Sequence, residues 1–111
     1  MAPPSQVAIA TSALQRLVKE ESSYHKELDQ QKARIVKLEK GETEDRQNLE
    51  YQLKQEQRAL EETKAVIPTI HDKIANAVDK LESVLDQGQT NDVERQNAAQ
   101  VLKEAKEVIE A

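Results

Sequence analysis

The chain lacks cysteine, phenylalanine and tryptophan, and its aromatic residues are Tyr24 and Tyr51 alone. Without cysteine there is no disulfide and no thiolate nucleophile. With so few aromatic residues, we do not expect a thick core with interior clefts. Gly41 and Gly88 are the only glycines, which excludes a glycine-rich phosphate loop and a glycine-flanked serine elbow. These absences argue against an enzyme, and we expect no catalytic residues.

Charge and hydropathy exclude two further classes of partner. The formal net charge is −5 at pH 7, and basic residues are mixed among the acidic ones. A phosphate backbone would be repelled on average, so we expect no nucleic-acid partner. No apolar run approaches the roughly 20 residues that a membrane helix needs, and the start of the chain does not resemble a secretory signal. We therefore expect a soluble, cytoplasmic protein with no membrane partner, no cofactor and no bound metal.

What the chain does contain is typical of long helices. Charged residues make up 33% of the 111 residues, and Ala, Glu, Lys, Leu and Gln are abundant. Signals for strands and hairpins are missing. The length is that of one domain, since typical domains have about 100 to 150 residues. The sequence predicts an all-α protein and a single coiled-coil-like domain over residues 1–111.

The first helix is predicted over residues 5–40. Its apolar residues recur alternately three and four positions apart, the spacing of one buried stripe. Ser5 is a good N-cap, and Gly41 can end the helix in a left-handed conformation. The residues of this stripe are Val7, Ala10, Leu14, Leu17, Tyr24, Leu28, Ile35 and Leu38.

The second helix is predicted over residues 43–86, with Thr43 as its cap and Gly88 just beyond its end. Its apolar stripe stays in phase where Pro68 interrupts it. A proline inside a helix costs about 3 kcal/mol or more, and burying each large aliphatic side chain contributes about 1.5 to 3 kcal/mol. Ile67 and Ile70 flank Pro68, so packing is expected to hold one long helix that is kinked at Pro68.

The third helix is predicted over residues 91–110, because Asn91 and Glu94 have the spacing of a capping box. The linkers before and after the second helix are only a few residues long, so consecutive helices must fold back on each other. The predicted fold is an antiparallel up-down-up three-helix bundle.

Polar residues interrupt the apolar stripes at Glu21, Gln31, Glu56 and Thr63. Such positions usually fix the register and topology of a bundle rather than bind a ligand.

The two histidines lead to two hypotheses. On a helix, Glu21, His25 and Asp29 would share one face and could in principle hold a metal, but such a row is far more often a solvated polar stripe. His71, near Pro68, is interpreted as a surface histidine rather than a pH sensor.

Two blocks of the sequence resemble the tubulin-binding cofactor A family. They are residues 13–21, followed by Tyr24, and residues 61–68, which end in the Ile67-Pro68 step; the Met1-Ala2-Pro3 start and residues 101–106 also fit. The resemblance covers nearly the whole chain. It implies a small cytosolic, cytoskeleton-associated cofactor that binds β-tubulin after its release from the chaperonin, holds it near-native and passes it on.

The resemblance also implies binding partners and a protein-binding site. The partners would be β-tubulin and other tubulin-folding cofactors, with no nucleotide or metal. The protein-binding residues we expect are Arg16, Lys19 and Glu20 from the matching block, together with Tyr24 and Pro68. A homodimer stays open, because the flanks of each apolar stripe could close a monomer or pair two copies.

Two alternatives remain at this point. A structural spacer of the spectrin-repeat kind fits the length and helix count, although such repeats usually bury a tryptophan. A prefoldin-like chaperone subunit would need a β-hairpin sequence between its helices, and none is visible.

Overall fold

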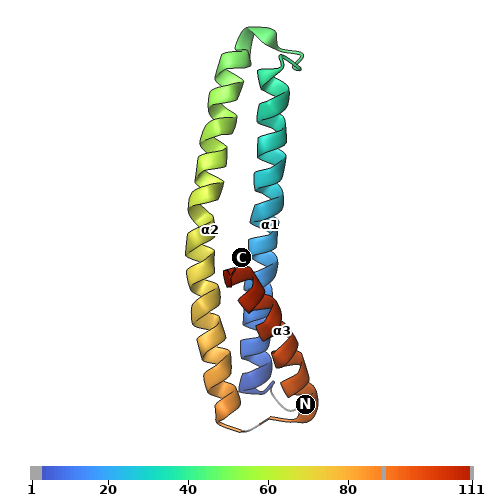
Figure 1. The fold of residues 1–111 in the computed structure, drawn as a ribbon, viewed down its shortest axis with the longest axis vertical. Coiled ribbons are helices and arrows are strands. Elements are labelled where there is room, and N and C mark those ends of the chain that lie inside the picture. The colour runs from blue at the N-terminus through green and yellow to red at the C-terminus, as the bar shows by residue number, and fades with distance from the viewer. Residues whose placement is uncertain (1–3, 89, 111) are drawn as a thin grey trace. The chain divides into compact units, whose positions relative to one another are not determined.

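The computed structural model describes residues 4–88 and 90–110, so the Met1-Ala2-Pro3 start lies outside the described residues. Within them the protein is all-helical, with three α-helices, one short 3-10 helix and no strand (Figure 1). The elements are α1 (Gln6–Glu39), η1 (Arg46–Asn48), α2 (Leu49–Asp86) and α3 (Asp92–Glu110). The predicted all-α class is confirmed, and the elements fit a helical bundle.

Helix α1 begins and ends as the sequence predicts. The Ser5 side-chain oxygen accepts the N–H of Ala8 at 3.0 Å, which caps an amide that has no partner within the helix. At the other end Gly41 has φ 77°, and its N–H donates to the carbonyl of Leu38 at 2.9 Å. Glycine adopts this left-handed conformation without a Cβ clash, which explains why the helix stops here.

Helix α2 begins later than predicted. We expected Thr43 to cap it, but the regular helix starts at Leu49, after η1. The hydroxyl of Thr43 donates to the Gln52 side chain at 3.1 Å and accepts the Asp45 N–H at 3.3 Å. The hydroxyl is therefore used within the loop rather than at a helix terminus. The cap position was wrong because Ser and Thr hydroxyls form loop turns as readily as helix caps.

Two predicted features of the later helices are confirmed. Pro68 lies inside α2, which runs to Asp86 before Gly88 at φ 76°. At the start of α3, the Glu94 N–H donates to Asn91 Oδ1 at 2.8 Å, and the Asn91 N–H donates to Glu94 Oε1 at 3.4 Å. This reciprocal pair is the capping box predicted from the spacing.

The chain divides into two compact units, and the first combines Met1–Glu21 with Thr69–Ala111. Parts of all three α-helices bury apolar side chains in this unit. The side chains of Leu14, Ile74 and Leu81 have no exposed surface. Among the described residues of this unit, the buried apolar side chains are Val7, Ala10, Leu14, Ile70, Ile74, Val78, Leu81, Val84, Ala98, Val101 and Ala105.

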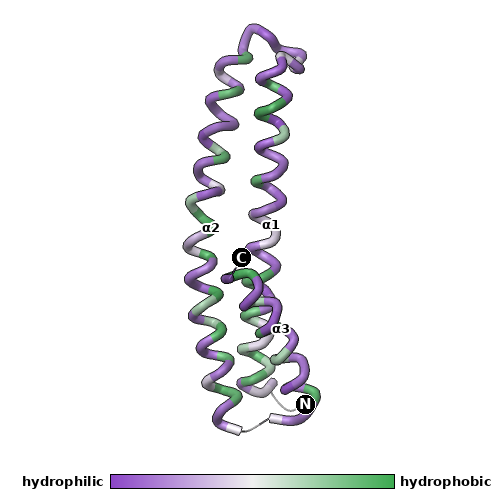
Figure 2. Tube along the Cα trace, viewed as in Figure 1, coloured by the Kyte–Doolittle hydropathy of each residue, from purple (hydrophilic) through white to green (hydrophobic). Residues whose placement is uncertain are grey.

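The second unit is Ser22–Pro68 and contains parts of α1 and α2 only. Its buried apolar residues, Leu28, Ile35 and Leu38, all come from α1. On α2, Leu53 and Leu60 are half-buried. Figure 2 shows that hydrophobic residues recur along the helices between hydrophilic ones. Two helices enclose less apolar surface than three, so this unit has the thinner core.

None of the helices in the described part of the chain has the length and apolar character of a membrane span.

Candidate protein-binding site

The five predicted binding residues are divided between the two units. Arg16, Lys19 and Glu20 are exposed on α1 in the first unit, and their three- and four-residue spacing puts them on one helix face. Tyr24 is half-buried and Pro68 is exposed, both in the second unit. Exposed side chains of opposite charge on one helix face can contact a protein partner.

Glu21 and His71 form a contact that the sequence analysis missed. Within the first unit, His71 Nε2 lies 3.3 Å from Glu21 Oε2, which joins α1 to α2. The Glu21 side chain is 6% exposed and that of His71 is 29% exposed. His71 is therefore not the surface histidine we expected. The two residues are 50 positions apart, and no local spacing rule connects them.

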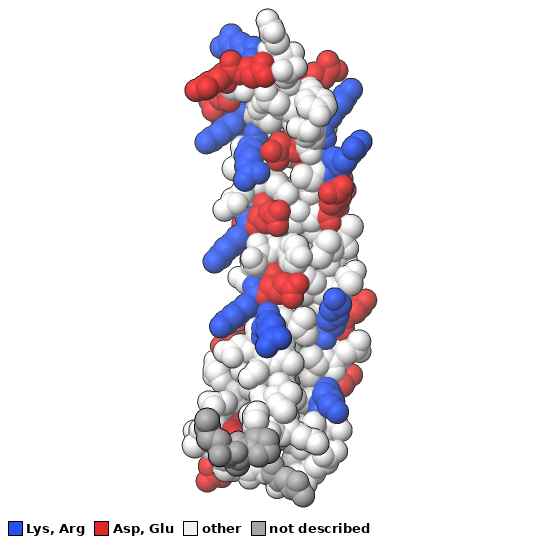
Figure 3. Space-filling view, turned by 180° about the vertical axis from the view of Figure 1, so that it is seen from behind, with Lys and Arg blue, Asp and Glu red and all other residues white. Residues whose placement is uncertain are grey.

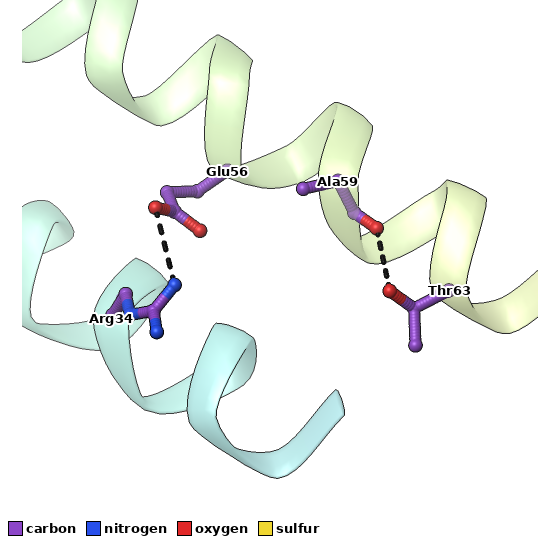
Figure 4. Close-up of polar contacts among 4 residues, drawn as sticks. All are labelled: Arg34, Glu56, Ala59 and Thr63. Atoms are coloured by element: carbon purple, nitrogen blue, oxygen red, sulfur yellow. Dashed lines mark hydrogen bonds and ion pairs between the residues drawn. The ribbon is translucent and has the colours of Figure 1, made fainter. Parts of the chain in front are cut away.

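The other polar residues of the apolar stripes lie in the second unit (Figure 4). The Arg34 guanidinium lies 3.7 Å from the Glu56 carboxylate and links α1 to α2. The hydroxyl of buried Thr63 donates to the carbonyl of Ala59 at 3.0 Å, four residues back on its own helix. Both contacts agree with the interpretation that these positions serve the fold rather than a ligand.

Gln31 differs from the other polar stripe residues. It is 4% exposed, and its Oε1 atom has no hydrogen-bond donor among the described residues. A buried acceptor without a partner costs about 1 to 3 kcal/mol. We therefore expect Gln31 to lower the stability of the second unit, which also has the thinner core.

Glu94 joins the N-termini of two helices in the first unit. Besides its capping box in α3, its carboxylate accepts hydrogen bonds from the hydroxyls of Ser5 and Thr90. The pKa of Glu94 lies below its ordinary value, chiefly because its carboxylate accepts a hydrogen bond from the Ser5 hydroxyl. Partial burial raises this pKa, and the hydrogen bonds from the Thr90 hydroxyl and the Asn91 amide lower it. The sequence pattern predicted the Asn91 contact but not Ser5, which is 89 positions away.

A groove of about 390 Å³ lies in the first unit, between α1 and α3. Its polar lining includes Thr11, Gln15, Asn97, Glu94 and Glu104. Thr11 donates its hydroxyl to the carbonyl of Val7 at 2.7 Å, so this side chain serves its own helix. The carboxylates Glu94 and Glu104 line the groove without a cation, so it has no group that would stabilise the negative charge of a transferred phosphoryl group.

The outer surface carries mixed charge. Figure 3 shows one face, on which Lys and Arg side chains are interspersed with Asp and Glu side chains. A face of mixed charge has no large field of one sign that would attract nucleic acid. Fold and surface together define a class of protein: an all-helical protein whose helices expose charged faces.

Within this class, the family is clear. The chain belongs to the family described as tubulin binding cofactor A, which it matches over residues 2–110. It is 35% identical to the tubulin-specific chaperone A of Saccharomyces cerevisiae over 97% of each chain. It is 34% identical to the tubulin-specific chaperone A of Mus musculus, over 96% of this chain and 89% of the mouse protein.

One solved structure is also similar. It is described as a beta-tubulin binding post-chaperonin cofactor, and it matches with a TM-score of 0.80 and 33% identity over 96% of this chain and 100% of its own. The predicted resemblance is therefore confirmed. Because the family consists of binding chaperones, the protein is not an enzyme. The alternatives of a spectrin-like spacer and a prefoldin-like subunit have no support in these matches.

Proposed function

We propose that this protein binds β-tubulin after its release from the cytosolic chaperonin, holds it in a near-native state and passes it on for assembly of the α/β-tubulin heterodimer. The observation that carries the proposal is the match to a beta-tubulin binding post-chaperonin cofactor over nearly the whole of both chains. Exposed helix faces without a catalytic group suit this role, since covering a partner's surface needs complementary area rather than chemistry.

The fold proposed for this function is one domain over residues 1–111, an antiparallel up-down-up bundle whose middle helix is kinked at Pro68. The position of Pro68 inside α2 supports the kink, because proline removes a helix hydrogen bond and clashes with the preceding turn. The boundary between the two units also falls directly after Pro68.

The β-tubulin site is proposed to use Arg16, Lys19 and Glu20, with Tyr24 and Pro68 contributing to the same function. Exposure of the first three supports this assignment, because a side chain that serves the core cannot contact a partner.

Other tubulin-folding cofactors are proposed as the recipients of β-tubulin, and the cytoplasm, in association with the cytoskeleton, as the place of action. For self-association, a homodimer is the alternative to a monomer.

Size-exclusion chromatography with light scattering tests the proposal. The purified protein is run alone, with dissociated β-tubulin and with α-tubulin. A stoichiometric complex with β-tubulin but not with α-tubulin is expected, and the free protein's mass in the same run distinguishes monomer from homodimer. Absence of a complex while β-tubulin stays soluble would contradict the proposal.

A further inference from the structure

Tyr51 is a large side chain that the fold leaves in solvent. It lies at the start of α2 in the second unit and is 62% exposed. Its Oη atom accepts a hydrogen bond from Gln55 Nε2 at 2.9 Å, one helical turn away. A phenol oxygen that accepts a bond from a neighbour still has its own O–H proton to donate. Tyr51 therefore offers an oriented donor to an acceptor outside the molecule.

Two cations lie beside this phenol. A hollow of about 350 Å³ is lined by Tyr51, Lys54, Gln55, Arg58, Ala59 and Glu62. All six residues belong to α2 and to the second unit, and the spacing of three and four residues places them on one helix face. The phenol, the ammonium and the guanidinium are three kinds of donor that can each bind a carboxylate.

The cations of this hollow are not used by the fold. In the part of the chain that the structure describes, neither Lys54 nor Arg58 forms an ion pair. Glu50 and Glu62 lie four residues away on the same helix, but exposed pairs at this spacing contribute only about 0.3 to 0.5 kcal/mol and leave the cations available. Tyrosine and arginine are also the residues that most often carry binding energy at protein interfaces.

A neighbouring hollow extends this surface. It occupies about 250 Å³ in the second unit and shares Gln55 with the first hollow. Its charged lining residues are the cations Arg34 and Lys37 and the carboxylates Glu42 and Glu56, so this part of the surface has mixed charge. Arg34 is paired with Glu56 but its side chain is still 58% exposed.

The groove of the first unit has a lining of the opposite charge. Its titratable lining residues are the carboxylates Glu94 and Glu104, without a cation. On a chain with a net charge of −5, a negatively charged partner segment would be repelled there and attracted at the Tyr51 hollow.

We propose that the surface formed by Tyr51, Lys54, Gln55 and Arg58 docks a polypeptide segment rich in Asp and Glu. Carboxylates of the segment accept from Tyr51 Oη, Lys54 Nζ and the Arg58 guanidinium, and the tyrosine ring covers the apolar part of a neighbouring side chain. This inference rests on the proposed function in that the segment belongs to β-tubulin, and it adds a second contact area to the residues on α1.

A paired substitution tests the inference. Lys54→Gln with Arg58→Gln removes both cations, and Lys80→Gln with Lys103→Gln is the control, because these lysines are also exposed and carry the same total charge. We expect the first variant to weaken β-tubulin binding about fivefold or more and to reduce its salt dependence, while the control changes it less than about twofold. Equal effects in both variants, or none in the first, would overturn the inference.

A crosslinking experiment identifies what lies on the surface. Tyr51→p-benzoylphenylalanine, irradiated in the complex with β-tubulin, should attach to a peptide of the partner that is rich in Asp and Glu, as read by mass spectrometry. Attachment to a basic or apolar peptide would refute the assignment.

Binding of a labelled decaglutamate peptide separates this inference from the proposed function. If wild-type protein binds decaglutamate and the Lys54/Arg58 variant does not, the surface is correct even where β-tubulin fails to bind. If β-tubulin binds both proteins equally and decaglutamate binds neither, the proposed function stands and the surface is wrong.

Discussion

His71 Nε2 lies 3.3 Å from the carboxylate of Glu21, and this contact joins α1 to α2 inside the first unit. The carboxylate is almost fully withdrawn from water, with 6% of the side chain exposed. A buried carboxylate that loses a partner retains its desolvation cost. The contact therefore matters more for stability than its partly exposed histidine would indicate.

Replacing this histidine should destabilise the protein. We expect His71→Ala to lower the free energy of unfolding by about 1 to 3 kcal/mol, because Glu21 stays buried with one partner fewer. Urea denaturation followed by circular dichroism measures the change. Lys73→Ala, at an exposed position on the same helix, is the control and should change stability by less than about 0.5 kcal/mol. Equal effects of the two substitutions would show that the pair contributes nothing.

Replacing Gln31 should stabilise the protein, in contrast to replacing His71. Because its Oε1 lacks a donor among the described residues, Gln31→Leu should raise the free energy of unfolding by about 1 to 3 kcal/mol. Thr63→Val is the comparison, since the Thr63 hydroxyl already donates to Ala59, and it should gain less. Thermal melts of the wild-type protein and of the two variants rank the three proteins by stability. A loss of stability in the Gln31 variant would mean that its amide makes bonds worth more than its unpaired oxygen costs.

The Glu94 carboxylate should make stability depend on pH. Its pKa in the folded protein lies below the ordinary value of 4.5, chiefly because of the Ser5 hydroxyl, so the folded state favours the charged form. The resulting stabilisation is complete above the ordinary pKa and is lost as the pH falls through the lowered, folded-state value. We expect Glu94→Gln to lower the melting temperature at pH 7 and to have a shrinking effect as the solution is acidified below pH 4.5. A pH-independent difference would assign the effect to geometry instead of charge.

Charge exchange on α1 tests the proposed β-tubulin site. Lys19→Glu combined with Glu20→Lys keeps the net charge and should weaken β-tubulin binding by about fivefold or more, with helicity unchanged. Asp79→Lys combined with Lys80→Glu exchanges another exposed neighbouring pair and serves as the control. Surface plasmon resonance gives both affinities. Unchanged binding in the first variant would remove Lys19 and Glu20 from the site.

Pro68→Ala tests how the proposed kink in α2 affects the stability of the protein and its binding of β-tubulin. Alanine restores the missing hydrogen bond inside α2, so we expect the free energy of unfolding to rise by up to about 3 kcal/mol while β-tubulin binding weakens through straightening of the helix. Calorimetry and the chromatographic binding assay measure the two effects. A drop in melting temperature would show that packing requires the bend.

How much the sequence predicts differs between local and distant features. The helix caps at Ser5 and Asn91 and the stop at Gly41 could be predicted, because the groups involved lie within a few residues of each other. The start of α2 could not, because the Thr43 hydroxyl can cap a helix or bond within a loop, and its partner Gln52 is nine residues away.

In the candidate site, too, some features could be predicted from the sequence and others could not. The exposure of Arg16, Lys19 and Glu20 follows from their position off the apolar stripe, and the structure agrees. The free donors around Tyr51 were not predicted, because a tyrosine in a helical pattern is as compatible with a half-buried position, which is what Tyr24 adopts.

By itself, the sequence determined that this protein is all-helical, where α1 and α3 are capped, and which stripe of each helix is apolar, because these properties depend on neighbours within two helical turns. Only the tertiary structure decided that Glu21 meets His71, that Ser5 meets Glu94 and that the Oε1 atom of Gln31 has no hydrogen-bond donor among the described residues. Contacts between residues far apart in the chain depend on how helices pack, and periodicity along one helix carries no information about its partner.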